Sequence, residues 1–202
     1  MIMKAKFLPL LTVVALAAAV SPQVDPEKGR SLGNPSAPVH MEVFSDFQCP
    51  GCKIFHEAVL PALMRDYVNT GKLYVFAHEF PLPGHQHSRE AANDAMAAVQ
   101  VGKYQQVSDS LFLNQTTWGN DGKVWDYVAK VLTPAEQAKV KSLAASPAVV
   151  AAVQKEFDSA IAQKIAQTPT VVLTRGAKRY PFGAPDQSNY PLLKSLIEEM
   201  LK

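Results

Sequence analysis

The sequence predicts an α/β domain whose sheet is interrupted along the chain by a long all-helical segment. Residues 39–77 follow a strand–helix–strand pattern, which is the minimal βαβ unit. Residues 88–166 show helical spacing of apolar side chains and no strand pattern. Residues 167–202 return to a strand pattern and end in a helix. This order indicates an α/β fold with one helical insertion.

The βαβ unit begins with a strand at residues 39–45, a short run that contains valine and phenylalanine and partly alternates. Cys49-Pro50-Gly51-Cys52 follows, then a helical stretch to about Asn69, and Pro61 inside it should bend the helix. Residues 73–77 are a continuous apolar run, which predicts a strand buried on both faces. One apolar helical face is marked by Phe55, Ala58, Val59, Ala62, Leu63 and Tyr67.

The helical segment contains two helix starts with a recognisable local chemistry. Thr133-Pro134-Ala135-Glu136 has the spacing of a capping box, and Ser146-Pro147 places proline at the first helical position. Residues 114–122 are rich in turn formers, so we expect an irregular gap there. Apolar side chains three or four residues apart mark the helical faces: Ala91, Ala95, Val99, Val107, Leu111, Val150, Val153, Phe157, Ile161 and Ile165.

The C-terminal part predicts a β-hairpin followed by a helix. Residues 170–174 are a short β-branched run, residues 175–177 form a turn, and residues 178–180 supply the return strand. From Asn189 onward, apolar pairs recur every four residues, which is typical of an amphipathic helix.

The N-terminus has the three-part pattern of a secretory signal. Lys4 and Lys6 precede an uncharged run at residues 7–20, and the alanines at residues 17–19 suit a cleavage site. An uncleaved anchor is the alternative, although the run is shorter than the roughly 20 residues that span a bilayer. We therefore expect cleavage near Ala19 and a periplasmic or otherwise extracytoplasmic protein.

We divide the chain into three parts on this basis. Residues 1–19 are the signal peptide, residues 20–38 an irregular leader, and residues 39–202 the folded domain. Within the domain, residues 39–80 and 167–202 form the core and residues 81–166 the helical insertion. Such a domain is long enough to bury a core without cross-links.

The composition excludes several classes of protein. Of the 202 residues, 48% are apolar and 19% are charged, which is ordinary for a globular protein. Without Lys4 and Lys6 the chain has 18 basic and 18 acidic residues, and this balance argues against a nucleic-acid binder. Two cysteines are too few for a scaffold with several disulfides.

The two cysteines carry the most specific chemistry in the sequence. Cys49 precedes the helix and Cys52 follows one turn later, so the two side chains lie on the same side at about 5–6 Å. Pro50 suits the first helical position. The helix N-terminus favours an anion, so the pKa of Cys49 should be lowered and Cys52 should be placed to attack a mixed disulfide on it.

Two other interpretations of the cysteines stay open. A purely structural disulfide across so small a ring would contribute only about 2 kcal/mol. A zinc or copper site would need histidines in addition to the two thiols, and His56, His78, His85 and His87 are the candidates. Their spacings match no zinc-finger pattern.

Thr168-Pro169-Thr170 is a second constellation. A proline cannot donate to a central ladder, but it is tolerated where it begins a strand. A cis bond between Thr168 and Pro169 would make the tight turn that such an entry needs, whereas an ordinary trans turn is the alternative, since only about 5–6% of X–Pro bonds are cis.

Together these features resemble the DsbA-type thiol-disulfide oxidoreductases of the thioredoxin-fold superfamily. The resemblance runs from about residue 31 to the C-terminus. Its motifs, in chain order, are Leu32-Gly33-Asn34-Pro35, Ala37-Pro38, Phe44-Ser45-Asp46-Phe47-Gln48-Cys49-Pro50, Phe80-Pro81-Leu82-Pro83, His87-Ser88, Ala91-Ala92, Leu111-Phe112, Thr168-Pro169-Thr170 and Gly183.

The resemblance implies a thioredoxin fold with an all-helical insertion between the second strand and the cis-proline strand. It also implies that Cys49 is the exposed nucleophile and Cys52 its buried partner. Pro169 would face the disulfide, and Thr168 would offer its backbone to an extended substrate segment. No cofactor is implied, and a membrane quinone-linked oxidoreductase would re-oxidise the pair.

Two departures from the family pattern concern the redox potential and proton transfer. The dipeptide between the cysteines is Pro50-Gly51, without the histidine of the strongest oxidants. The acidic residue often found six positions before the first cysteine is replaced by Val43.

From these features we expect an exported, monomeric protein disulfide oxidoreductase that acts on cysteine thiols of other proteins, as an oxidant. The alternatives are an extracytoplasmic disulfide reductase or isomerase and, in a different class, a metal-binding chaperone that uses cysteines and histidines.

Overall fold

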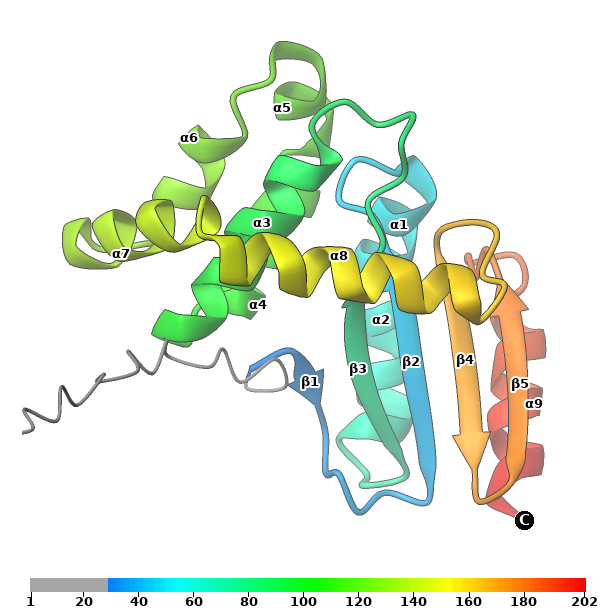
Figure 1. Cartoon of the computed structure of the whole chain (residues 1–202). Coiled ribbons are helices and arrows are strands. Elements are labelled where there is room, and N and C mark those ends of the chain that lie inside the picture. The colour runs from blue at the N-terminus through cyan, green and yellow to red at the C-terminus, as the bar shows by residue number, and fades with distance from the viewer. Residues whose placement is uncertain (1–28) are drawn as a thin grey trace, which may run out of the picture.

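The computed structural model describes residues 29–202, so the expected signal peptide at residues 1–19 and the first part of the leader lie outside the described residues. The fold contains a five-stranded sheet with the strand order β1-β3-β2-β4-β5. Figure 1 shows this sheet with the helical segment at one end of it. The strands are β1 (Ser31–Leu32), β2 (Val39–Ser45), β3 (Leu73–Glu79), β4 (Thr170–Arg175) and β5 (Lys178–Gly183).

The predicted βαβ unit and C-terminal hairpin are both present. Strand β2 pairs in parallel with β3, which sets Val43 beside Ala77 and Ser45 beside Glu79. Strand β4 runs antiparallel to both β2 and β5. The sheet is therefore mixed, and the carboxyl end of its central strand β2 leads through residues 46–48 to the first cysteine.

Two details of the sheet differ from expectation. The leader is not wholly irregular, because β1 pairs antiparallel with β3; two residues are too few to show an alternating pattern. Strand β3 is not buried on both faces: Leu73 and Val75 are buried, but Tyr74 and Phe76 are only half-buried. The reason is that helix α8 crosses only one end of that face (Figure 1).

The helical stretch after the cysteines runs without a break, but its turns vary in width. It consists of α1 (Pro50–Ile54), a π-helical turn at Phe55–Val59, α2 (Leu60–Leu63) and a second π-helical turn at Met64–Val68. The Leu60 N–H donates to the Phe55 carbonyl, five residues back. Such widened turns accommodate a proline within a helix, and Pro61 lies between the two.

The segment between β3 and β4 contains helices and no strand within its described residues, as predicted. The capping box of Thr133 and Glu136 is present, and Ser146 caps the longest helix. The expected gap at residues 114–122 is instead a helix, because Trp118 is buried and its Nε1 donates to the Leu111 carbonyl at 2.7 Å. The α-helices are α3 (Ser88–Ala98), α4 (Tyr104–Leu113), α5 (Gln115–Asp121), α6 (Val124–Ala129), α7 (Pro134–Ala144) and α8 (Pro147–Ala162).

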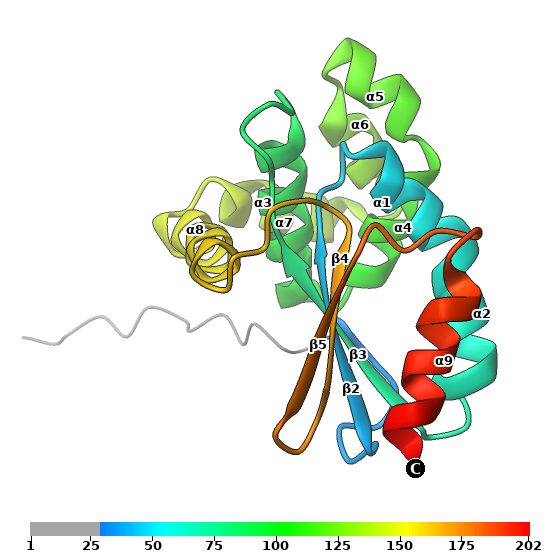
Figure 2. The same cartoon turned by 90° about the vertical axis from the view of Figure 1, so that its right-hand side faces the viewer.

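The sheet lies between two helical layers. Figure 2 shows α1, α2 and the C-terminal helix α9 (Tyr190–Leu201) on one side and α8 on the other. One hydrophobic core fills the space between the sheet and the first layer. A second core lies among the helices of the insertion, and both Cys49 and Cys52 belong to it. The cysteine pair therefore lies where the sheet meets the helical segment.

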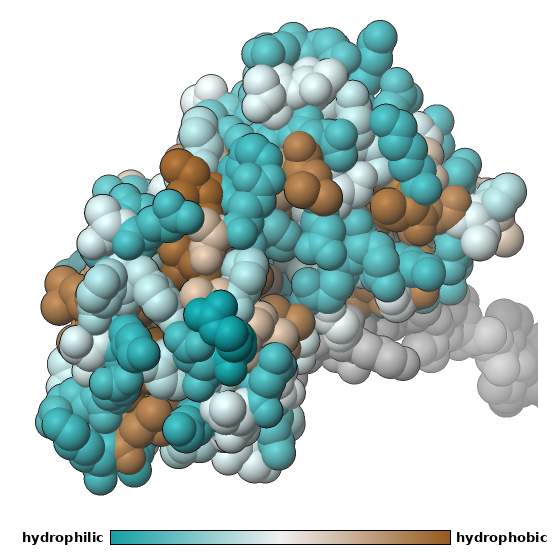
Figure 3. Space-filling view, turned by 180° about the vertical axis from the view of Figure 1, so that it is seen from behind, coloured by the Kyte–Doolittle hydropathy of each residue, from teal (hydrophilic) through white to brown (hydrophobic). Residues whose placement is uncertain are grey.

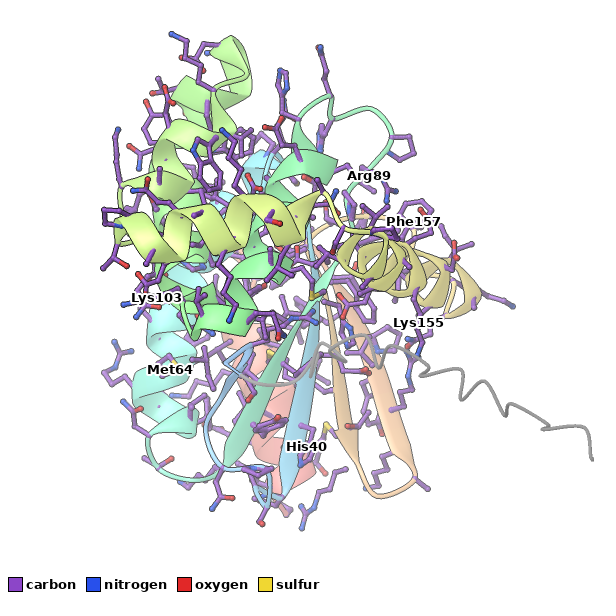
Figure 4. The ribbon with its side chains drawn as sticks, turned by 60° about the vertical axis from the view of Figure 1, so that its left-hand side comes forward. His40, Met64, Arg89, Lys103, Lys155 and Phe157 are labelled. Carbon is purple, nitrogen blue, oxygen red and sulfur yellow. The ribbon has the colours of Figure 1, made fainter. Side chains whose placement is uncertain are left out.

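The outer surface has no single large apolar face on the side seen in Figure 3, where apolar residues form separate patches. On another side, Arg89 of α3 lies over the ring of Phe157 of α8, 5.6 Å from its centroid, and ties the two helices together (Figure 4). Within residues 29–202, no helix is long and apolar enough to cross a membrane.

Candidate active site

The cysteine pair lies at the carboxyl end of β2, where the chain turns into α1. Cys49 is the residue before the helix, with an extended backbone, and Pro50 occupies the first helical turn. Both cysteines are free thiols. Cys52 is completely buried, and Cys49 is only 8% exposed, so Cys49 is less exposed than the family resemblance implied. The reason is that the helical segment packs over the start of α1.

A buried carboxylate fixes the loop before Cys49. Asp46 is 1% exposed and accepts hydrogen bonds from the Gln48 and Leu82 N–H groups at 2.7 and 2.8 Å. The Ser88 hydroxyl donates to it at 2.6 Å, and His85 Nδ1 lies 2.7 Å away. A buried carboxylate is stable only when it is satisfied in this way. Asp46 thus joins the end of β2 to the loop before α3.

Two glutamines hold the same loop against the helical segment. Gln115 Nε2 donates to the carbonyls of Phe47 and Cys49 at 2.7 and 2.9 Å. The Gln48 side chain accepts from the His87 N–H at 2.8 Å. The backbone on the N-terminal side of Cys49 is therefore set by residues from the start of α3 and from α5.

The predicted turn at Thr168 lies directly against the cysteines. The Thr168–Pro169 bond is cis, which confirms the prediction from the sequence. The sulfur of Cys49 lies 3.3 Å from the Thr168 carbonyl oxygen. Pro169 packs on the active-site dipeptide, because a Cβ added to Gly51 would lie 3.1 Å from Pro169 Cδ. The structure therefore brings Cys49, Pro50-Gly51, Cys52, Thr168 and Pro169 into one site.

The pKa of Cys49 is lowered to about 5. The largest cause is a hydrogen bond from the Cys52 thiol, which favours the thiolate, while partial burial opposes it. The Thr168 side chain adds to the lowering, as do the N–H groups of Gly51 and Cys52 in the first turn of α1. The lowering agrees with the expected effect of the helix N-terminus, although the neighbouring thiol contributes more.

Cys52 is affected in the opposite direction. Burial raises the pKa of Cys52 well above its ordinary value, and the negative charge on Cys49 adds to this. The Asp46 N–H donates weakly to its sulfur at 3.4 Å. At neutral pH the reduced pair therefore consists of a thiolate at Cys49 and a thiol at Cys52, which is the arrangement that thiol–disulfide exchange requires.

Three of the four histidines considered as metal ligands pair with acidic side chains. His85 pairs with Asp46, His56 with Asp109 at 2.8 Å, and His78 with Glu42 at 3.1 Å. Among residues 29–202, no group of three or more histidine, cysteine, aspartate or glutamate side chains has a geometry that could hold a metal ion.

Several residues of the site were not identified from the sequence. Asp46 belongs to the motif that ends in Cys49-Pro50, but nothing in the sequence around it shows that it is buried. Gln115 lies in the stretch predicted to be irregular. Glu79 is buried at the end of β3 and lines the same cavity as Cys52, and the sequence shows it only as a polar residue after an apolar run.

The comparisons with known proteins agree with this geometry. A family model described as thioredoxin matches residues 25–179. The probable disulfide bond formation protein D of Bacillus anthracis is 26% identical over 184 residues, covering 86% of this chain and 78% of that protein. The oxidised structure of BdbD from Bacillus subtilis superposes with a TM-score of 0.71 at 25% identity, covering 86% of this chain and 94% of that one.

A more distant structure supports the fold alone. The alpha-DsbA1 protein of Wolbachia pipientis has a TM-score of 0.70 at 18% identity and covers 85% of this chain and 90% of that one. The family model covers most of the described fold, including both cysteines and the cis proline. The chain therefore belongs to the thioredoxin family and is a protein disulfide oxidoreductase.

Proposed function

We propose that the protein is exported and oxidises pairs of cysteine thiols in other proteins. The observation that carries this direction is the lowered pKa of Cys49, about 5. A thiolate that is stable at neutral pH stabilises the reduced form of the pair, and a pair whose reduced form is stabilised is a strong oxidant. Cys49 is then the nucleophile of the site, and Cys52 is its buried partner.

The reaction proceeds in two exchanges. A substrate thiolate attacks the Cys49 sulfur of the oxidised pair, the Cys49–Cys52 bond breaks, and a mixed disulfide forms between the substrate and Cys49. A second substrate thiolate then attacks the substrate sulfur of that bond. The substrate leaves with a disulfide, and the cysteine pair retains the two electrons and is reduced.

Thr168 and Pro169 form the substrate-binding side of the site. Thr168 borders the Cys49 sulfur through its carbonyl, and an extended segment of substrate can pair with its backbone as an added strand. Pro169 lies against Gly51, where a Cβ would come within 3.1 Å of Pro169 Cδ, so a larger residue at position 51 would crowd this side of the site.

The cellular setting follows from the expected signal peptide. In an extracytoplasmic compartment disulfides persist, so an oxidant can act there. By family resemblance, a membrane quinone-linked oxidoreductase re-oxidises the pair. The exchange itself requires no bound cofactor, and we propose that the protein acts as a monomer. Cysteine-containing exported proteins are its substrates.

The redox potential of the pair tests the direction. The purified protein should be equilibrated with mixtures of reduced and oxidised glutathione, and the fraction of free Cys49 should be measured by alkylation. We expect a potential between about −120 and −180 mV, the range of oxidants and isomerases. A potential near −270 mV, typical of thioredoxin, would show that the protein is a reductase.

A further inference from the structure

A small cavity lies behind Cys52, between the sheet and α4. Its volume is about 50 Å³, enough for a water molecule, which needs roughly 10–15 Å³. Cys52 lines one side of it, and Ser45 and Glu79 line another from the ends of β2 and β3. Tyr104 and Ser108 of α4 also line it. A water molecule in this cavity has enough polar partners to be retained.

Glu79 is the buried acid of this cavity. It is 2% exposed, and its Oε1 accepts a hydrogen bond from the Tyr104 hydroxyl at 2.7 Å. In the parallel register of β2 and β3, Glu79 lies beside Ser45, and a hydrogen bond links the Ser45 side chain to Cys52. Cys52, Ser45 and Glu79 therefore follow one another along the wall of one cavity.

Cys52 must gain a proton when the Cys49–Cys52 bond breaks, and the proton donor has not been named so far. When a substrate attacks Cys49, Cys52 leaves as a thiolate in a completely buried position, and burial makes that anion costly. The residue six positions before Cys49 is Val43, which also lines the cavity and carries no exchangeable proton. We propose that Glu79 donates the proton to the departing Cys52 sulfur through the cavity, and takes it back when Cys52 attacks.

The step balances in both directions. In the forward direction the substrate thiolate forms a bond to the Cys49 sulfur, the electron pair of the Cys49–Cys52 bond goes to Cys52, and the Glu79 carboxyl proton neutralises it by way of a water molecule. In the reverse direction the Cys52 thiol gives its proton to the Glu79 carboxylate and attacks the mixed disulfide. No oxidant other than the disulfide itself is required.

The surroundings of Glu79 keep it protonated at neutral pH. Burial raises the pKa of Glu79 to about 8. The groups that face it are Arg30 and the Tyr104 hydroxyl, which lower its pKa, and Glu156 and Asp46, which raise it. Arg30 is itself paired with Glu156 at 2.6 Å. The protonated acid is therefore available to the departing sulfur below about pH 8.

The test measures how the oxidised protein is reduced by dithiothreitol from pH 6.5 to 9.5, with acid quenching and alkylation of free thiols. Each rate is divided by the fraction of dithiothreitol present as thiolate. The corrected rate of the wild type should fall as pH rises through about 8, where Glu79 loses its proton. Glu79→Gln should be slower by at least about tenfold at pH 6.5 and independent of pH, because general acid catalysis contributes about 100-fold or more.

Two further variants make the result specific. Glu42→Gln changes a half-buried glutamate that is bonded to His78, on the other face of the sheet, and should keep the wild-type profile. Tyr104→Phe removes a hydrogen bond that lowers the pKa of Glu79, so the fall in rate should move to higher pH. His56 also lines the cavity, but burial lowers its pKa, so it titrates below the tested range.

The outcomes separate this inference from the proposed function on which it rests. A Glu79→Gln protein with the wild-type rate and profile, or a Glu42→Gln protein as slow as Glu79→Gln, would overturn the assignment. If Glu79→Gln does not fold by circular dichroism, an unshifted profile in Tyr104→Phe overturns it instead. Reduction by dithiothreitol does not depend on the direction in the cell, so a potential typical of a reductase would contradict the proposed function alone.

Discussion

The two sides of the Cys49 sulfur are built differently. On the N-terminal side, the Asp46 carboxylate accepts hydrogen bonds that join its loop to the loop before α3 and to the start of α3. Gln115 of α5 donates hydrogen bonds to the backbone carbonyls of the same loop. On the other side, the neighbour is the Thr168–Pro169 turn. The Thr168 carbonyl lies against the sulfur. Among residues 29–202, the buried Thr168 hydroxyl has no hydrogen-bond partner besides Cys49.

This difference separates two tasks. The N-terminal side, held by Asp46 and Gln115, fixes the position of the sulfur. Its polar groups are already hydrogen-bonded, and they would lose these hydrogen bonds if the loop moved. On the Thr168–Pro169 side, the Thr168 carbonyl and hydroxyl are left to bind either the sulfur or an incoming substrate chain. A disulfide exchange site needs both, since the nucleophile must be positioned while the substrate must be able to come and go.

The largest expected effect concerns which of the two cysteines forms the mixed disulfide with a substrate. Cys49→Ala should abolish exchange completely, whereas Cys52→Ala should keep the low-pKa thiol and accumulate mixed disulfides with substrates. The measurement is non-reducing electrophoresis of each tagged variant, expressed with an export signal and quenched in acid. Equal trapping by both variants would show that the polar environment of Cys49 does not select the attacking sulfur.

The second effect is the pH dependence of the stability of the two redox forms. The pKa of Cys49 is about 5 in the folded reduced protein and near 8.5 when unfolded, so the folded state binds fewer protons between these values. Stability of the reduced form should therefore rise with pH from about 5 to 8.5, by at most about 1.4 kcal/mol per pH unit, and be lost as pH falls through 5.

The oxidised form is the control for this effect, because it has no thiol to titrate. The free energy of unfolding of each form is measured in urea at several pH values. The value for the reduced form minus the value for the oxidised form should become more positive as pH rises. A difference that stays constant from pH 5 to 8 would mean that the site does not stabilise the Cys49 thiolate.

The third effect tests the N-terminal side. Asp46→Ala should lower the free energy of unfolding by about 3 kcal/mol, because it leaves the Gln48 and Leu82 N–H groups buried without an acceptor. Asp109→Ala is the matched control: its carboxylate is exposed and pairs with His56, so about 0.5 kcal/mol is expected. Urea unfolding of the reduced proteins measures both, and equal losses would show that Asp46 is not a structural anchor.

The parts of the fold that could be predicted are those determined by local chemistry. The bounds of β2, the capping box at Thr133, the start of α8 at Ser146 and the turn at Pro169 each depend on a few neighbouring residues. Cys49 and Cys52 were identified for the same reason, since their spacing and their place before a helix are local.

The features that were missed depend on contacts between distant parts of the chain. Strand β1 exists only because it pairs with β3, and α5 is helical because Trp118 is buried against Leu111. Asp46 and Glu79 look like ordinary acidic residues in the sequence. Asp46 bonds to Leu82, 36 residues away, and Glu79 bonds to Tyr104, 25 residues away. Periodicity carries no information about such partners.

The smallest effect tests the Thr168–Pro169 side. Thr168→Val keeps the shape of the side chain but removes the hydroxyl that helps to lower the pKa of Cys49, so this pKa should rise, by less than about one unit because the Cys52 thiol contributes more. The pKa is read from thiolate absorbance at 240 nm during a pH titration of the reduced protein. Thr170→Val is the control, because the Thr170 hydroxyl donates to the Gln167 carbonyl at 2.8 Å. If both variants shift the titration equally, the Thr168 hydroxyl has no special relation to the sulfur, and the difference between the two sides of Cys49 reduces to the backbone alone.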